Sequence, residues 1–333
     1  MAAAKYDVVA IGNAIVDVIA KADDAFIIAE NLKKNTMQLL FSTEAAEALY
    51  AKMGPGIEAS GGSAANTVAG LAALGRTCGF IGQVADDQLG QVFAHDIRAL
   101  GVAFDTPMRA ETDPSTARCL ILVTPDGHRT MNTYLGASQF LPESALDRDL
   151  IADGAILYLE GYLWDPEEPR AAMRAAIDIA HAAGRKVAFT LSDTFCISRH
   201  RADFVKLIEN GDIDILFANE AEITSLNETE DFEAAVAKTA AHVPLLVVTR
   251  SEHGAIAVAD GERFAVPAAP VAAVVDTTGA GDLFAAGFLA GQAEGRSITD
   301  SLTMGALAAA EIISHFGARP EVDLKALVAA RLG

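Results

Sequence analysis

Two glycines and an aspartate in the segment 276–282, Asp-Thr-Thr-Gly-Ala-Gly-Asp, could together bind a phosphate group and deprotonate an alcohol. Gly279 and Gly281 flank Ala280, so the backbone can turn sharply there and approach another molecule closely. The alanine-rich run that follows is typical of a helix, and unpaired N–H groups at a helix start attract anions. Asp282 lies at that start, where its carboxylate could accept a proton from a hydroxyl group. A phosphate site beside a carboxylate base is what phosphoryl transfer to an alcohol requires.

Other interpretations of this segment use the same residues. Asp282 could be only a helix N-cap, because aspartate is common at that position. A dinucleotide-binding G-x-G-x-x-G motif would need a glycine at position 284, where the chain has Phe284. A Walker phosphate loop would need a Gly-Lys-Ser/Thr run, and no lysine follows Gly281. The N-cap interpretation therefore stays open, whereas the two nucleotide-binding motifs do not match.

Further polar residues come at the carboxyl ends of predicted strands, where open parallel sheets bind their ligands. Asn13 and Asp17 follow the first predicted strand, and Asp17 interrupts an otherwise apolar run. The Asp17 carboxylate could accept hydrogen bonds from the paired hydroxyls of a sugar, or it could face solvent on an exposed strand. Gly62, Ser63 and Asn66 precede or begin a second alanine-rich run. They form either a binding loop or an ordinary helix cap.

A third group of polar residues follows later strands. Asn219 and Glu222 are three residues apart, on one face if the segment is helical. Two such oxygen-bearing side chains could hold the waters around Mg²⁺, but an Asn cap with an acidic first turn gives the same sequence. Thr249 and Arg250 follow the next strand. Tyr162 could stack on a base, although a buried aromatic residue at a strand end is at least as common.

Composition restricts the class of protein. With 333 residues, of which 51% are hydrophobic, the chain can bury a large core. A formal net charge of -20 argues against a sequence-independent grip on nucleic acid, which needs clustered lysine and arginine, but not against small phosphorylated ligands. The three cysteines show no metal or disulfide spacing and fit a reducing cytoplasm. Because charged and small residues interrupt the apolar runs, we expect no membrane span.

The order of predicted elements indicates one doubly wound α/β domain over residues 1–333. Buried strands separated by helices imply a parallel sheet covered on both faces; they are predicted at 8–12, 78–84, 155–159, 186–191, 213–217 and 245–249. Strands with alternating apolar and polar residues are half-exposed; they are predicted at 15–20, 36–41, 117–123 and 128–134. These should form a small β-sheet lid, contributed by about 13–42 and 104–137, that excludes water from the site. A late helix is predicted at 297–316.

Two segments together resemble the signatures of the ribokinase-like (PfkB) family of sugar and nucleoside kinases: Asp-Thr-Thr-Gly-Ala-Gly-Asp at 276–282 and Gly-Gly-Ser-Ala-Ala-Asn at 61–66. The resemblance covers nearly the whole chain. It implies a doubly wound, mainly parallel sheet with a β-sheet lid, ATP as phosphate donor, Mg²⁺, and often a monovalent cation such as K⁺.

Within that family the chain is most similar to adenosine kinases, through the segments 12–17, 161–162, 191–195 and 213–222. This similarity implies an ATP-dependent kinase for the 5′-hydroxyl of a purine ribonucleoside, with adenosine converted to AMP in purine salvage. A ribokinase- or fructokinase-type sugar kinase, and a guanosine or inosine kinase, are the alternatives. A nucleoside-binding protein without turnover is a further alternative, against which the intact Gly-Ala-Gly-Asp run argues.

The same resemblance implies a role for each matching residue. Asp282 would be the catalytic base, and Gly279, Ala280 and Gly281 the anion hole. Substrate would be bound by Asn13, Asp17, Gly62, Ser63, Asn66, Tyr162 and Phe195. The nucleotide would be bound by Asn219, Thr249, Arg250, Gly279, Gly281, Ala306 and Ala309. Asn219 and Glu222 would bind Mg²⁺ through water, and Asp276 and Thr278 would bind the monovalent cation.

The chain departs from the family pattern at two positions. Ser251 stands where a glycine is usual after the nucleotide strand, and Tyr162 replaces a phenylalanine, which adds a hydroxyl at the base pocket. Arg118 and Arg129 fall in predicted lid strands and could reach the phosphates on closure. The expected partner is a small nucleoside or sugar. The sequence leaves the choice between monomer and homodimer open.

Overall fold

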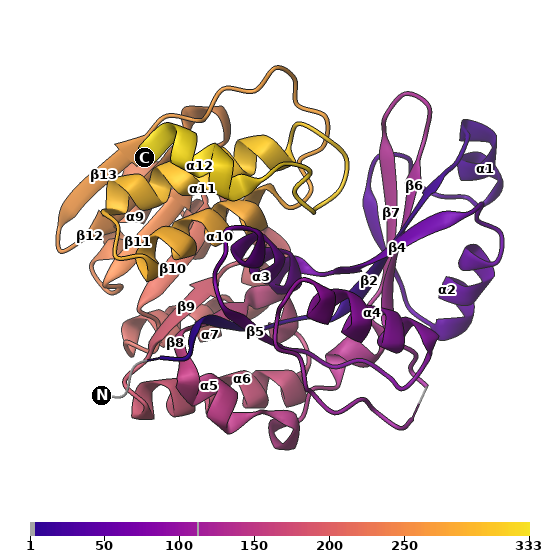
Figure 1. The fold of residues 1–333 in the computed structure, drawn as a ribbon, viewed down its shortest axis with the longest axis horizontal. Coiled ribbons are helices and arrows are strands. Elements are labelled where there is room, and N and C mark those ends of the chain that lie inside the picture. The colour runs from indigo at the N-terminus through magenta and orange to yellow at the C-terminus, as the bar shows by residue number, and fades with distance from the viewer. Residues whose placement is uncertain (1–3, 112) are drawn as a thin grey trace.

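The computed structural model describes residues 4–111 and 113–333, which form two β-sheets and their covering helices (Figure 1). The larger sheet has eight strands in the order β13-β12-β11-β10-β9-β8-β1-β5. They are β1 (Tyr6–Ile11), β5 (Cys78–Ile81), β8 (Gly154–Glu160), β9 (Lys186–Thr190), β10 (Ile215–Asn219), β11 (Leu245–Thr249), β12 (Ala255–Ala259) and β13 (Glu262–Val266). All neighbours from β5 to β11 pair in parallel, and β11, β12 and β13 pair antiparallel. The predicted parallel sheet is confirmed, and the hairpin of β12 and β13 extends it at one edge.

Helices cover both faces of this sheet, as the continuous burial of Val8, Val9, Ala10 and Ile11 in β1 requires, because successive side chains of a strand point to opposite faces. Val8 and Ala10 belong to one buried apolar cluster with residues of α3, α10, α11 and α12, and Val9 and Ile11 belong to another with residues of α5 to α9. The helices are α1 (Asp24–Ala29), α2 (Thr43–Tyr50), α3 (Ser63–Ala73), α4 (Gln88–Ala99), α5 (Arg148–Asp153), α6 (Glu167–Ala182), α7 (Thr194–Glu209), α8 (Glu220–Asn227), α9 (Phe232–Ala240), α10 (Ala280–Ala293), α11 (Ile298–Ile312) and α12 (Leu324–Leu332). Short 3₁₀ turns lie at Gly136–Gln139, Glu143–Ala145, Gly161–Trp164 (η3) and Ser251–His253.

The smaller sheet stands beside the larger one, with α1 and α2 on its outer side (Figure 1). Its five strands, in the order β3-β7-β6-β2-β4, are β2 (Ile15–Lys21), β3 (Met37–Leu40), β4 (Gly56–Gly61), β6 (Ala117–Val123) and β7 (Arg129–Tyr134). The four alternating segments are therefore strands of one sheet, as predicted. Along β2, Val16 and Val18 are buried, while Ile15 and Asp17 on the other face line a cavity.

Several elements differ from the sequence prediction. Strand β5 ends at Ile81, whereas it was predicted over 78–84. β4 was not predicted, because Gly56–Gly61 begins and ends with glycine and its alternating part, Ile-Glu-Ala-Ser, is short; its antiparallel pairing with β2 makes it a strand. The helix predicted at 297–316 ends earlier, at Ile312. The chain then turns, and Gly317, with a φ of 97°, donates its N–H to Asp276. This turn brings the segment after α11 back to the start of α10.

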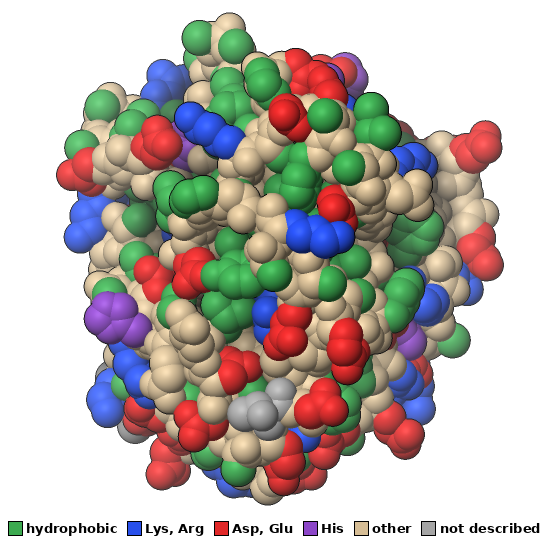
Figure 2. Space-filling model, turned by 90° about the vertical axis from the view of Figure 1, so that its right-hand side faces the viewer, with side chains coloured by type: hydrophobic (Ala, Val, Ile, Leu, Met, Phe, Trp, Pro, Cys, Tyr) green, Lys and Arg blue, Asp and Glu red, His purple; other side chains and the backbone are tan. Residues whose placement is uncertain are grey.

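The surface of the small-sheet side carries both signs of charge. Lysine and arginine side chains are scattered among aspartates and glutamates on the face that Figure 2 shows. No helix within the described parts of the chain combines the length and the apolar character needed to cross a membrane.

Candidate active site

A cavity of about 510 Å³ lies between the carboxyl ends of the larger sheet, the start of α10 and the inner face of the small sheet. Most of the predicted site residues line it: Asp17, Gly62, Ser63, Asn66, Tyr162, Asn219, Glu222, Thr249, Thr278, Gly279, Ala280, Gly281 and Asp282. Six do not: Asn13, Phe195, Arg250, Asp276, Ala306 and Ala309. Segments more than 200 residues apart in the chain therefore meet at one site.

The turn before α10 is built around Gly279. This residue is the helix N-cap and has a φ of 78°, a conformation that side chains other than glycine rarely adopt. A Cβ at Gly279 would also lie 2.9 Å from the Cβ of Ala318. At Gly281, by contrast, a Cβ would meet no protein atom within 4 Å, and the residue is exposed to the cavity. In the first turn of α10, the N–H of Ala280 donates to the Thr277 carbonyl at 3.2 Å, whereas the N–H groups of Gly281 and Asp282 are left for the cavity.

Asp282 is the third residue of α10 and is held by another helix. Ser63 Oγ donates to Asp282 Oδ1 at 2.7 Å, and Asn66 Nδ2 donates to Asp282 Oδ2 at 3.0 Å. The interpretation of Asp282 as a simple N-cap is wrong, because Gly279 is the cap and no side chain caps this helix. Burial raises the pKa of Asp282 to about 6, although the hydrogen bonds from Ser63 and Asn66 lower it. The carboxylate is thus ionised at neutral pH and able to accept a proton.

Asp17 is the second carboxylate of the cavity. Burial raises its pKa to about 6, against the opposing effects of Arg319 and Arg129. A Cβ at Gly61 would lie 2.5 Å from the carboxyl carbon of Asp17, so only glycine lets β4 pack beside it. On the same wall, Gly62 has a φ of 98°, and a Cβ there would lie 2.2 Å from the carbonyl oxygen of Asn13.

Glu160, at the end of β8, joins the loop after β1 to the start of α3. Its Oε1 accepts hydrogen bonds from the backbone N and the Nδ2 of Asn13, each at 2.6 Å, and its Oε2 accepts from Ala64 N at 2.7 Å. Ser138 Oγ donates to Asn13 Oδ1 at 2.8 Å. Asn13 is therefore held by Glu160 and Ser138 and does not line the cavity. Sequence reasoning missed Glu160, although a polar residue directly after the predicted strand 155–159 was a usable signal.

Asn219 and Glu222 form a capping box at the start of α8. Asn219 Oδ1 accepts from Glu222 N at 2.8 Å, and Glu222 Oε2 accepts from Asn219 N at 3.0 Å. The cap interpretation of this pair is therefore correct, and both residues also line the cavity. Burial raises the pKa of Glu222 to about 7. A buried carboxylate facing the cavity is a suitable neighbour for a hydrated divalent cation.

The wall beyond β8 and β9 contains Tyr162. Its backbone N–H donates to Ser192 Oγ, and its hydroxyl donates to the Ser192 carbonyl, both at 3.2 Å. Ser192 has a φ of 70°. The added hydroxyl therefore fixes the ring against the neighbouring loop. Phe195, at the start of α7, is 70% exposed and lies outside the cavity lining.

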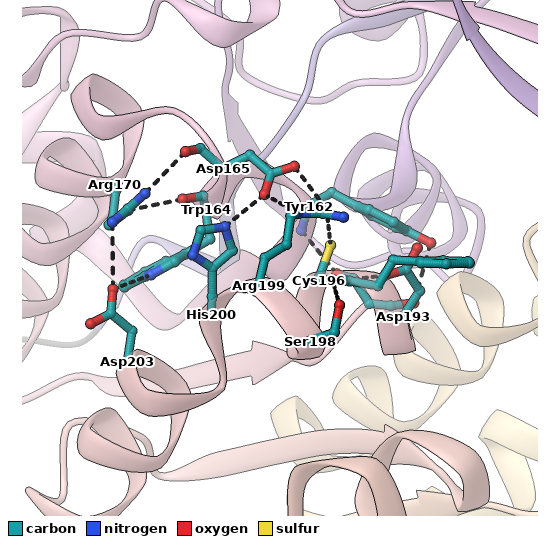
Figure 3. A network of polar contacts seen from close by, with 12 residues as sticks. Tyr162, Trp164, Asp165, Arg170, Asp193, Cys196, Ser198, Arg199, His200 and Asp203 are labelled. Carbon is teal, nitrogen blue, oxygen red and sulfur yellow. Dashed lines mark hydrogen bonds and ion pairs between the residues drawn. The ribbon is translucent and has the colours of Figure 1, made fainter.

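An ionic network behind this wall joins η3 to α7 (Figure 3). Asp165 accepts from Arg199 Nε at 2.7 Å and from Arg199 NH2 at 2.8 Å, and its Oδ1 lies 2.6 Å from His200 Nε2. Trp164 Nε1 donates to Asp203 at 3.0 Å. These contacts anchor the turn that carries Tyr162.

Three predicted nucleotide residues have other contacts. Arg250 Nε donates to Glu220 at 2.9 Å, and its guanidinium lies 4.3 Å from the ring centroid of Phe232. Ala306 belongs to the buried apolar cluster, and Ala309 packs against it. Their roles in nucleotide binding stay predictions.

Asp276 lies beside the cavity and already has a cationic partner. Its Oδ2 is 2.5 Å from Arg129 NH1, both side chains are buried, and its Oδ1 accepts from the N and Oγ1 of Thr278. Gly317 N donates to Oδ2 at 3.1 Å. With all these partners, the Asp276 carboxylate does not fit a monovalent cation as its ligand in this arrangement. Arg129 is thus paired with the loop before α10.

Residues 46–324 match the pfkB family of carbohydrate kinases, and the chain belongs to this family. Kinases of this family are phosphotransferases that act on the hydroxyl group of a sugar or nucleoside. The chain has the ribokinase-like fold, a large mainly parallel sheet with a second small sheet.

Named relatives include both sugar and nucleoside kinases. A probable sugar kinase from Rhizobium etli has a structure with a TM-score of 0.90 and 47% identity, covering 98% of both chains. The adenosine kinase from Sinorhizobium meliloti has a TM-score of 0.88 and 50% identity, covering 98% of this chain and 99% of that one. A fructokinase from Klebsiella pneumoniae is 30% identical over 250 residues, 74% of this chain and 80% of that enzyme.

Proposed function

We propose that this chain is an ATP-dependent kinase that phosphorylates the 5′-hydroxyl of a purine ribonucleoside, with adenosine as the acceptor. The observation that carries the proposal is the Asp282 carboxylate, which lines the cavity at the first turn of α10 and accepts hydrogen bonds from Ser63 and Asn66. At one helix start, a carboxylate base can deprotonate the acceptor hydroxyl while backbone N–H donors stabilise the charge on the transferred phosphoryl group.

In this proposal each wall of the cavity has one task. Asp282 accepts the proton of the acceptor hydroxyl, and the N–H groups of Gly281 and Asp282 stabilise the charge on the transferred phosphoryl group. Asp17 accepts hydrogen bonds from the ribose hydroxyls and thereby orients the reacting oxygen. ATP would bring Mg²⁺, which screens the phosphate charges; Asn219 and Glu222 fit its outer shell because both line the cavity.

A base-bearing acceptor is favoured over a free sugar by the inner face of the small sheet. Ile15, Ile121 and Met131 line the cavity there, and Tyr162 lines it from the opposite side. A purine has two apolar faces that such side chains can cover, whereas a free hexose presents hydroxyls that would lose their hydrogen bonds to water. The 50% identity to an adenosine kinase supports this choice. The fructokinase relative makes a sugar the second candidate.

We further propose that the segments 13–42 and 104–137 act as a lid. Three apolar side chains of the small sheet are exposed: Met37 (52%), Leu39 (43%) and Ile57 (72%). They lie on the inner face together with the residues that pair with them on the neighbouring strands, which are Met131, Thr133 and Ile19 in the same order. An apolar inner face left open without substrate would be covered when the lid closes, and closure would exclude water from the transfer.

The test is a panel of acceptors assayed with ATP and Mg²⁺: adenosine, guanosine, inosine, ribose and fructose, with ADP release as the readout. We expect the highest kcat/KM for adenosine. A preference for fructose or ribose would overturn the acceptor but keep the kinase. Preference for guanosine or inosine would change only the base. No acceptor-dependent ADP release at all, from folded protein, would overturn the proposed function as a whole.

A further inference from the structure

We propose that Arg319, in the segment between α11 and α12, is a positioning residue that keeps Asp282 ionised by fixing the orientation of the Asn66 amide. The proposal rests on the proposed function, in which Asp282 is the base. It concerns a residue outside both sequence signatures and outside the cavity lining.

The contacts of Arg319 join three separate elements. Its NH1 donates to Asn66 Oδ1 at 2.6 Å, and its NH2 donates to the carbonyl and to the Oγ of Ser60, the latter at 2.9 Å. Ser60 is itself held, because its N and Oγ both donate to Asp96 Oδ2, at 2.7 and 2.5 Å. The NH2 group is thus held by β4, which α4 holds in turn, and the NH1 group donates to Asn66 of α3.

The donor-only chemistry of arginine decides how Asn66 lies. A guanidinium has N–H donors and no acceptor, so the Asn66 atom facing it must be the carbonyl oxygen. The Nδ2 of the same amide must then face Asp282, to which it donates at 3.0 Å. A hydrogen bond donated to a carboxylate favours its charged form. Without Arg319, the amide could turn over and offer its oxygen to a protonated Asp282, which would favour the neutral acid.

The charges around the site agree with this role. The titratable groups that interact electrostatically with Asp282 are Asp17 of β2, Tyr158 and Glu160 of β8, Tyr162 of η3, and Arg319; Arg129 of β7 acts on the neighbouring Asp17. Arg319 lowers the pKa of both Asp282 and Asp17 against the effect of burial. Burial in turn lowers the pKa of Arg319 itself. The positive charge of Arg319 acts on both carboxylates and therefore offsets part of the cost of keeping both ionised.

The test is the pH dependence of kcat/KM for adenosine at saturating ATP and Mg²⁺, in wild type, Arg319→Gln, Arg319→Lys and Asn66→Ala, because kcat/KM reports the groups of the enzyme before adenosine binds. Wild-type kcat/KM should fall on the acid side near the pKa of Asp282, which is about 6. In Arg319→Gln that acid limb should move up by about one pH unit, the lower end of the effect of a nearby opposite charge, with kcat/KM restored at high pH. Arg319→Lys should move it less, because the charge stays. Asn66→Ala should move it in the same direction.

Two controls separate this inference from other causes. Arg331→Gln removes an exposed arginine from α12 and should leave the pH profile unchanged. Thermal melts of all variants report folding; a merely structural Arg319 would lower stability and kcat/KM at every pH without moving the acid limb, which would overturn the proposal. An unmoved limb in Asn66→Ala would overturn it even if Arg319→Gln did not fold. A wild type without kinase activity would instead refute the proposed function.

Discussion

The starts of α10 and α8 meet the same cavity and carry a carboxylate at the same helical position, yet the two acids have different partners. In α8, Asn219 caps the helix, and the carboxylate of Glu222 folds back onto the N–H of that cap. In α10, Gly279 is the cap and has no side chain, and the carboxylate of Asp282 reaches across to Ser63 and Asn66 of α3.

The comparison teaches that the N-cap residue decides what a carboxylate in the first turn is free to do. A capping box uses the acid to satisfy its own helix. A glycine cap leaves the N–H groups of the turn open for a ligand and releases the acid to an external partner. Burial raises the pKa of both acids, so electrostatics alone does not tell them apart. The hydrogen-bond partners of the two acids do differ, and this difference supports the proposal that the base is Asp282 of α10.

The largest expected effect separates the two acids by activity. Asp282→Asn should lower kcat by roughly 10²–10⁴-fold, because it removes the proton acceptor. Glu222→Gln should lower it by less than about tenfold, because glutamine also completes a capping box. Steady-state kinetics with ATP and adenosine measure both, and circular dichroism melts check that the variants fold. Equal losses in the two variants would break the distinction between the helices.

The next effect tests the open turn of α10. Gly281→Ala should lower kcat/KM for ATP by on the order of tenfold, because the new Cβ enters the space that a phosphate would occupy, while the helix itself gains up to about 1 kcal/mol from losing a glycine. Gly279→Ala is the matched control. It should lose activity and stability together, because its φ of 78° and its contact with Ala318 disfavour a Cβ. A Gly281→Ala enzyme with unchanged kinetics would contradict a phosphate site at this turn.

How far the sequence could predict this site depends on whether its parts are local. Gly279, Gly281 and Asp282 lie within one turn, so their types and spacing were informative. The parallel strands were predictable because each is a continuous apolar run between helices. Strand β4 was not, because it is made a strand by pairing with β2.

The partners of Asp282 illustrate the remaining limit. Ser63 and Asn66 were recognised as a second loop, but that they hold the carboxylate follows from packing between segments over 200 residues apart. Arg319 and Glu160 lie outside every local motif, and the structure alone brings them to Asn66 and Asn13. For Arg250 the local sequence was misleading in the other direction. Its position after a strand suggested a ligand contact, but its guanidinium donates a hydrogen bond to Glu220 and lies over the ring of Phe232.

A third prediction treats the two acids alike. The folded-state pKa is about 6 for Asp282, against an ordinary 3.8, and about 7 for Glu222, against an ordinary 4.5. In the pH range from each ordinary pKa to the folded-state pKa, the folded protein therefore binds more protons than the unfolded chain. Stability should therefore fall as pH rises through that window, and each ionised acid costs stability above it. Asp282→Asn and Glu222→Gln should both raise the melting temperature at pH 8, and less so at pH 5. Calorimetry at the two pH values measures this; a larger gain at pH 5 would contradict burial as the cause.

The smallest expected effect concerns the loop that leads into α10. Because the Asp276 carboxylate is paired with Arg129 and also accepts hydrogen bonds from Thr278 and Gly317, a monovalent cation has no free carboxylate there. We therefore expect no measurable change in kcat when K⁺ is replaced by the bulky N-methylglucamine cation at equal ionic strength. Arg129→Gln would remove the internal cation and leave the buried Asp276 carboxyl group without its ion-pair partner, so any K⁺ dependence should first appear in that variant. Strong activation of the wild type by K⁺ would show that Arg129 leaves Asp276 during turnover.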